Sequence, residues 1–139
     1  GKPRGMGAAP PATASAPDPR ILALPAPYNA ADYQRGRTAW RNNRCATCHT
    51  YVAGGPNMTG PNLHGMFGRE VGAVSGFTYS PALTEANFTW DPAKLDQWLT
   101  NPQEFLKGNR MAMEGIPNAT ARRDLIAFLM VETAAPAAP

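Results

Sequence analysis

Cysteine and histidine are scarce in this sequence of 139 residues. The only cysteines are Cys45 and Cys48, and the only histidines are His49 and His64. Two thiols are too few for the four-thiolate ligation of an iron–sulfur cluster. A zinc site would need all four of these side chains, whereas structural zinc usually takes its ligands as two separated pairs. Because Cys48 and His49 are chain neighbours, they are awkward partners on one zinc ion.

Long apolar runs and a strong net charge are missing as well. No apolar stretch is long enough to cross a bilayer, and none stands near the start, so we expect any export signal to have been removed. The net charge of +3 is a mild basic excess, which argues against nucleic-acid binding as the main function. We therefore expect no membrane span in this chain and no nucleic-acid partner.

The sequence Cys45-Ala46-Thr47-Cys48-His49 is the attachment pattern for c-type haem. Its spacing brings both sulfurs to one side of a single helical turn, within reach of the two vinyl groups of one porphyrin. The imidazole that follows then points at the iron as the proximal ligand. A redox-active dithiol has the same cysteine spacing but does not need the histidine. We therefore expect one haem c, bound covalently through Cys45 and Cys48.

Composition divides the chain into three parts. Residues 1–28 are dominated by Ala, Pro and Gly, which favours a flexible arm or tether. Residues 29–133 carry the apolar periodicity of a folded domain, and residues 134–139 return to Ala and Pro as a disordered tail. The arm is either an inert leader or tag remnant or a tether to a membrane anchor or another domain.

Three amphipathic stretches predict helices, and no strand pattern stands out. The candidate capping residues are, in chain order, Asn29 or Asp32, Asp91, and Asn118 or Thr120. Gly36 falls in the middle of the first helix, where glycine costs about 1 kcal/mol relative to alanine. We expect that cost to be offset by the close approach of another helix. Repeated glycine and proline from 54 to 76 predict a long loop.

Several short segments outside the haem motif form a series. They are Gly60-Pro61-Asn62-Leu63-His64-Gly65, Phe67-Gly68-Arg69, Gly76-Phe77-Thr78-Tyr79, Thr89-Trp90, Asn101-Pro102, Gly108 with Met111 and Gly115, and Asp124-Leu125-Ile126-Ala127-Phe128-Leu129. In content and spacing, this series resembles the small class I cytochromes c of mitochondria and bacterial periplasms. The resemblance implies an all-α fold, the class I cytochrome c fold, in which helices and long loops wrap around one covalently bound haem.

The resemblance also implies roles for single residues. Cys45 and Cys48 would form the thioethers, and His49 and Met111 would ligate the iron. The carbonyl of Pro61 would accept the other ring N–H of His49, which fixes the tautomer of the ligand. Spacing alone leaves Met111 and Met113 open as the distal ligand. The family places a glycine three residues before the methionine and another four residues after it, which selects Met111.

A second set of implied residues surrounds the haem. Arg69, Tyr79 and Trp90 would surround a haem propionate, since a guanidinium and two aromatic donors can satisfy buried negative charge. Trp98 stands where the family usually has a tyrosine whose hydroxyl touches the methionine sulfur, and Leu83 stands where an asparagine is common. Both changes make the distal pocket less polar. His64 is expected to hold its loop by a hydrogen bond.

A haem with two axial protein ligands has no open position for a substrate, and His/Met ligation raises the reduction potential. We therefore expect a one-electron carrier rather than an enzyme, acting as a monomer. Its partners would be the larger donor and acceptor redox proteins of a respiratory chain, in the membrane or the periplasm. The alternative is a haem enzyme or gas sensor with a labile distal ligand. The expected location is the bacterial periplasm, where the protein would be free or tethered through the arm, and the alternative is the mitochondrial intermembrane space.

Overall fold

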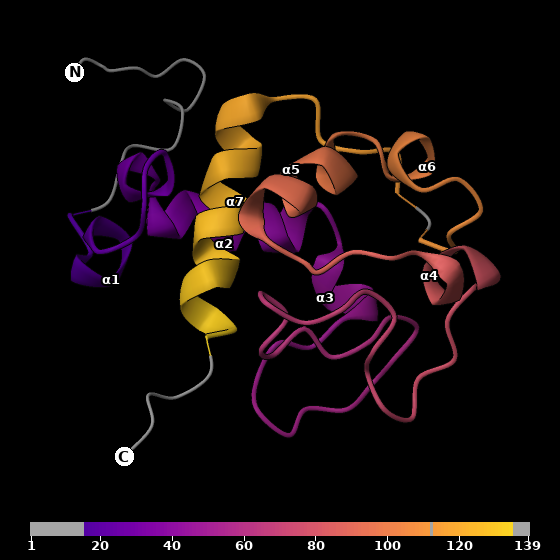
Figure 1. Ribbon diagram of the computed structural model, residues 1–139. Coiled ribbons are helices and arrows are strands. Elements are labelled where there is room, and N and C mark those ends of the chain that lie inside the picture. The colour runs from indigo at the N-terminus through magenta and orange to yellow at the C-terminus, as the bar shows by residue number, and fades with distance from the viewer. Residues whose placement is uncertain (1–15, 112, 135–139) are drawn as a thin grey trace.

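The computed structural model describes residues 16–111 and 113–134 and shows a helical protein (Figure 1). The helices are α1 (Pro19–Leu22), α2 (Tyr33–Asn42), α3 (Cys45–Cys48), α4 (Pro81–Glu85), α5 (Pro92–Thr100), α6 (Pro102–Phe105) and α7 (Ala119–Glu132), with a 3₁₀ turn at Tyr28–Ala30. Within these residues, strand-like pairing is limited to one antiparallel bridge between Glu70 and Thr89. The predicted all-α fold is therefore confirmed.

Each of the three predicted helices begins at a side chain that caps it. Asp32, Asp91 and Asn118 each accept a hydrogen bond from the backbone N–H three residues later, at 2.8, 2.7 and 2.9 Å. These bonds satisfy donors that have no partner within the helix. Of the alternatives that the sequence left open, Asn29 lies in the 3₁₀ turn and Thr120 lies inside the first turn of α7.

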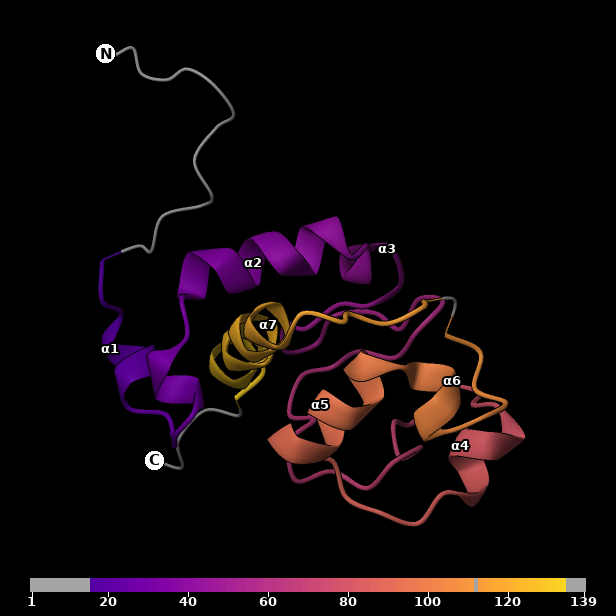
Figure 2. The same ribbon diagram turned by 90° about the horizontal axis from the view of Figure 1, so that it is seen from above.

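Helices α2 and α7 cross at Gly36, as the sequence predicted (Figure 2). A Cβ atom on Gly36 would lie 2.7 Å from the Cβ of Phe128 and would overlap the backbone carbonyl of Asp124. Phe128 is fully buried at the crossing, and its ring lies 5.3 Å from that of Tyr33 and 6.4 Å from that of Trp40. The glycine therefore allows the two helix backbones to come close enough to bury these rings.

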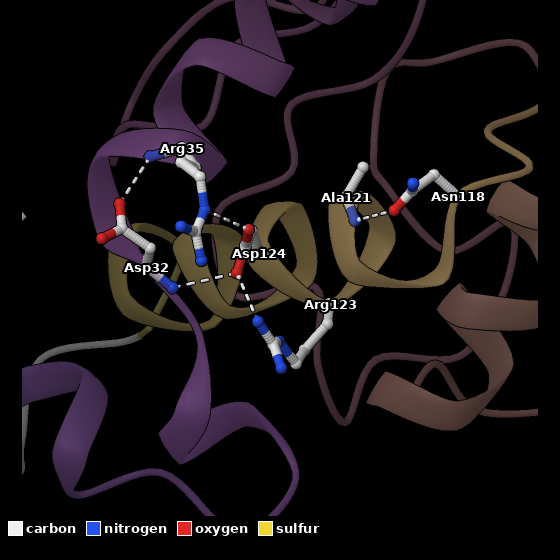
Figure 3. A network of polar contacts seen from close by, with 6 residues as sticks. All are labelled: Asp32, Arg35, Asn118, Ala121, Arg123 and Asp124. Atoms are coloured by element: carbon white, nitrogen blue, oxygen red, sulfur yellow. Dashed lines mark hydrogen bonds and ion pairs between the residues drawn. The ribbon is translucent and has the colours of Figure 1, made fainter. Parts of the chain in front are cut away.

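A buried carboxylate joins the start of α2 to α7 (Figure 3). The side chain of Asp124 is only 3% exposed, and it accepts hydrogen bonds from the backbone N–H of Asp32 at 2.9 Å and from Nε of Arg35 at 3.0 Å. Arg123 adds a third contact at 3.3 Å. Because charge-assisted bonds of this kind are strong and directional, they fix the position of α2 along α7.

The segment from residue 16 to 28 differs from the flexible arm that its composition suggested. Asp18 caps α1, and Ile21 is only 2% exposed. The guanidinium of Arg20 lies 4.8 Å from the ring centroid of Tyr33 and 3.6 Å from the carboxylate of Glu132. One buried isoleucine and the contacts of Arg20 with Tyr33 of α2 and Glu132 of α7 thus connect the segment to the folded domain. Residues 1–15 and 135–139 lie outside the described residues, so the three-part division of the chain stays a prediction.

Candidate haem site

The haem-attachment motif forms a helical turn of its own. Arg44, with a φ of 61°, separates α2 from α3, and the N–H of His49 donates to the carbonyl of Cys45 at 2.9 Å. Both cysteines are free thiols on this turn. Burial raises the pKa of the Cys45 thiol to about 11, so the thiol is neutral near pH 7. The turn therefore presents two unpaired sulfurs at the spacing that covalent haem attachment needs.

His49 makes the hydrogen bond that the resemblance implied. Its Nδ1 lies 2.8 Å from the carbonyl oxygen of Pro61. A carbonyl can only accept, so Nδ1 carries the proton and Nε2 keeps a lone pair for a metal. Burial lowers the pKa of His49, and the Pro61 carbonyl partly opposes this shift. The ring is therefore neutral at pH 7, which is the state that binds iron.

Gly60 supports the same ring from a second side. A Cβ atom at this position would lie 2.6 Å from Nδ1 and 2.7 Å from Nε2 of His49. The N–H of Gly60 also donates to the carbonyl of Cys48 at 2.7 Å. Gly60 was not predicted from the sequence to have a role of its own. Its position directly before Pro61 was the available signal, because a backbone that contacts a ring so closely has no room for a side chain.

Asn109 holds the segment that carries Met111, the predicted distal ligand. Asn109 is 7% exposed, and its amide nitrogen donates to the carbonyls of Pro102 and Leu106, both at 2.9 Å. Its side-chain oxygen accepts the N–H of Met111 at 2.8 Å. Sequence reasoning missed Asn109, and only its place between Gly108 and the methionine hinted at a structural role. The position of Met111 is thus fixed through one buried amide.

Met111 and Met113 share one environment in the structure. Both are partly buried against the same hydrophobic core, and the N–H of Met113 donates to the carbonyl of Met111 at 3.0 Å. The residue between them, Ala112, lies outside the described residues. The geometry does not separate the two thioethers, so the choice of Met111 still rests on the family pattern.

Arg69 is the residue that best fits a buried anion. Its guanidinium donates to the carbonyls of His64 at 3.0 Å and Asn62 at 3.2 Å. Burial lowers its pKa, an effect that nearby Tyr79 partly opposes. No carboxylate in the described part of the chain pairs with it at salt-bridge distance. A partly desolvated cation without a counter-charge suits the carboxylate of a haem propionate.

The structure places three further aromatic residues that were predicted to bind the cofactor, namely Tyr79, Trp90 and Trp98. The hydroxyl oxygen of Tyr79 accepts the N–H of Val74 at 3.0 Å, which leaves its O–H available to donate to another group. Trp90 and Trp98 are both buried and pack edge to face with their ring centroids 5.6 Å apart. Trp98 therefore takes part in an aromatic cluster. Contact of these three side chains with a haem stays a prediction.

The side chain of His64 does not make the hydrogen bond that we expected. Its Nδ1 is buried and has no hydrogen-bond partner among the residues described. The backbone of His64 holds the loop instead. Its N–H donates to the side-chain oxygen of Asn62 at 2.6 Å, and its carbonyl accepts from Arg69. Both bonds are made by backbone groups of His64, so the imidazole is not needed to hold the loop.

Two other expectations concern metals and membranes. Nowhere in residues 16–111 and 113–134 do three or more His, Cys, Asp or Glu side chains gather closely enough to hold a metal ion. The zinc alternative therefore has no assembled donor set in that part of the chain. Among the same residues, no helix has the length and apolar character needed to cross a membrane.

Comparison with known proteins shows several close relatives. No family model matches the sequence. Cytochrome c of Kluyveromyces lactis is 38% identical over 107 residues, which are 77% of this chain and 96% of that protein. Cytochrome c of Chlamydomonas reinhardtii is 42% identical over 105 residues, covering 76% and 93% of the two chains. Cytochrome c of Arabidopsis thaliana is 40% identical over 102 residues, covering 73% and 90%.

Proposed function

The chain belongs to the cytochrome c family, and from this premise we propose that it holds its haem iron between His49 and Met111. The protein is an electron carrier, not an enzyme, and its cofactor is one haem c attached to Cys45 and Cys48. The main support for His49 as the proximal ligand is its hydrogen bond to Pro61. Nδ1 of His49 is bonded to Pro61, so the ring can offer only Nε2 to a metal.

The bound haem supplies a reversible one-electron couple, and the residues of the chain fix its surroundings. His49 is oriented by Gly60 and Pro61, and Met111 is placed by Asn109. Arg69 balances the charge of a propionate. With His49 and Met111 both held by the chain, the iron would keep no free position for a substrate, so the haem would supply electron transfer without bond formation to a substrate. The hydrogen bonds that hold His49 and Met111 would also limit their movement between the two oxidation states.

The partners of this carrier are redox proteins. We propose membrane-bound donor and acceptor complexes of a respiratory chain, approached by a monomer. The relatives named above come from a yeast, a green alga and a plant, so the comparisons do not support the periplasmic location that we expected. The proposed location is the alternative, the mitochondrial intermembrane space.

Substitution of the two methionines tests the ligand assignment. In the oxidised protein, Met111→Ala should abolish the weak long-wavelength absorption band of the iron–thioether bond and lower the reduction potential. Met113→Ala is the matched control, because it removes a thioether from the same environment, and it should keep the band. The opposite result would assign the distal ligand to Met113. Binding of carbon monoxide by the reduced wild-type protein at neutral pH would instead favour an enzyme or sensor with a labile distal ligand.

A further inference from the structure

The loops that follow the haem motif contain almost no charge. From Cys45 to Gly68 there is no Lys, Arg, Asp or Glu, and from Cys45 to Thr84 the only charged side chains are Arg69 and Glu70. In Figure 1 this region forms the magenta loops below α3. The charged side chains of the chain are therefore concentrated elsewhere, on the helices and toward the two ends of the sequence.

The same region exposes large apolar side chains. Among the described residues, three large hydrophobic side chains are strongly exposed, namely Leu22 at 58%, Val52 at 57% and Met58 at 45%. Val52 and Met58 lie in the loop of residues 50–60, which we call the proximal loop. Leu22 lies on α1, which both ribbon views place at the end of α2 remote from α3 (Figures 1 and 2).

The proximal loop is bound directly to the haem-attachment turn. The N–H of Gly60 donates to the carbonyl of Cys48 at 2.7 Å, and the N–H of Met58 donates to the carbonyl of Gly60 at 2.9 Å. Gly60 also packs on the ring of His49. Met58 is therefore two residues from a backbone group that contacts the proximal ligand, so a partner seated on Met58 lies close to the site of electron exchange.

Internal hydrogen bonds make the proximal loop rigid. The side-chain amide nitrogen of Asn62 donates to the carbonyls of Val52 at 2.9 Å and Gly55 at 2.7 Å. The hydroxyl of Thr50 donates to the carbonyl of Pro56 at 2.8 Å. Several polar groups of the loop are thus used internally, whereas its exposed apolar side chains remain available. A surface that is already ordered loses little conformational entropy when a partner binds.

From these observations we propose that the proximal loop, through Val52 and Met58, is the docking surface for a redox protein whose matching face is apolar and uncharged. This proposal rests on the proposed function as an electron carrier. A charged partner surface would lose hydration here without meeting an opposite charge, which costs free energy. An apolar face gains from burial, and the interface stays small enough for transient contact.

Voltammetry on coated gold electrodes tests the proposal with probes of defined chemistry. The haem-loaded protein is adsorbed on methyl-terminated, carboxylate-terminated and ammonium-terminated alkanethiol monolayers. We expect the highest electroactive coverage on the methyl surface. We also expect that coverage to survive an increase of ionic strength from about 0.01 to 0.5 M, because apolar contact is not screened by salt. A preference for a charged monolayer, with loss of signal in salt, would overturn the proposal.

Two variants and one matched control locate the surface. Val52→Lys and Met58→Lys should each reduce coverage on the methyl monolayer by about tenfold or more. Leu22→Lys introduces the same charge at an equally exposed apolar residue far from the haem turn, and it should leave coverage unchanged. An equal loss in all three variants would refute the assignment to the proximal loop. The haem spectrum of each variant checks that the fold is intact.

Two further measurements exclude other occupants of the surface. Sedimentation should show a monomer at micromolar concentration, and neutral phosphatidylcholine vesicles should not bind the protein. A dimer that Val52→Lys disrupts would assign the surface to a second copy of the chain, and vesicle binding would assign it to lipid; each result would overturn the proposal. Failure of the proposed function looks different, since the protein in solution would then give no one-electron wave with a small soluble mediator.

Discussion

Substitution of Gly36 by alanine tests the helix crossing on which the fold depends. Two effects of opposite sign compete. Alanine in the middle of α2 gains about 1 kcal/mol in helix propensity relative to glycine. Its Cβ, however, would lie 2.7 Å from the Cβ of Phe128 and overlap the carbonyl of Asp124. Overpacking of a core typically costs about 1–3 kcal/mol.

The steric effect should win. The atoms that meet the new Cβ are the backbone of α7 and the first side-chain carbon of a fully buried phenylalanine, so no rotamer change can relieve the overlap. The helices must instead move apart, which loosens Phe128 and Trp40 together. With the overpacking cost at or above the upper end of its range, Gly36→Ala should lower the free energy of unfolding by about 2 kcal/mol after the gain in propensity.

Guanidinium unfolding of the haem-loaded protein, followed by circular dichroism, measures this change. For a domain of about 100 residues, a loss of 2 kcal/mol corresponds to a fall of roughly 10 °C in Tm. Thr38→Ala is the control, because Thr38 is exposed on the same helix and its replacement should raise stability by a few tenths of a kcal/mol. If Gly36→Ala were as stable as the wild type or more stable, the close contact between α2 and α7 at Gly36 would be refuted.

Three further changes test separate contacts. Ile21→Ala should lower the free energy of unfolding by about 2 kcal/mol, which is the low end for a buried isoleucine, whereas the exposed Leu22→Ala should change it by no more than about 0.5 kcal/mol. Small and equal effects of the two substitutions would show that this segment is a flexible arm after all. The pKa of Tyr33 is raised because burial and then Glu132 disfavour the phenolate, although Arg20 opposes this shift. The unfolded chain therefore ionises first, so stability should fall as pH rises above about 10, and less steeply in Tyr33→Phe; identical slopes would contradict this. Gly60→Ala should displace the proximal imidazole and reduce the yield of haem-loaded protein, which absorbance measures, and a normal yield would show that the ring tolerates the methyl group.

The helices and the proximal half of the site could be predicted because their signals are local. A cap, an apolar stripe and a mid-helix glycine each act within a few residues, so Asp32 was one of two candidate caps and the close approach at Gly36 was predicted correctly. The haem motif lies within a single turn, and its geometry follows from the spacing alone. Only the family resemblance could assign the bond from His49 to Pro61, because the two residues are twelve positions apart in the sequence and are joined by a loop.

The parts that could not be predicted either depend on contacts between segments that are distant in sequence or are too short to show a pattern. The composition of residues 16–28 suggested an arm, yet one buried side chain, Ile21, and the contacts of Arg20 at the end of α7 order the segment. The short helices α4 and α6 begin at Pro81 and Pro102 and have too few residues to show a periodic pattern. Asn109 bonds to the carbonyls of Pro102 and Leu106, which precede it in the sequence, and the irregular turn that holds Asn109 has no periodic pattern from which its hydrogen bonds could be predicted.

The C-terminal end of α7 links the helix crossing to the loop that orients His49, the proposed proximal ligand. The N–H of Gly65 donates to the carbonyl of Thr133 at 2.7 Å, and Thr133 is only 1% exposed, with its hydroxyl bonded to the carbonyl of Leu129. Gly65 belongs to the same loop as Pro61, whose carbonyl orients His49. A displacement of α7 would therefore pull on the loop that sets the tautomer and direction of the imidazole. The crossing along the middle of α7 therefore stabilises the fold, whereas its C-terminal turn stabilises the position of His49 through the loop that carries Pro61.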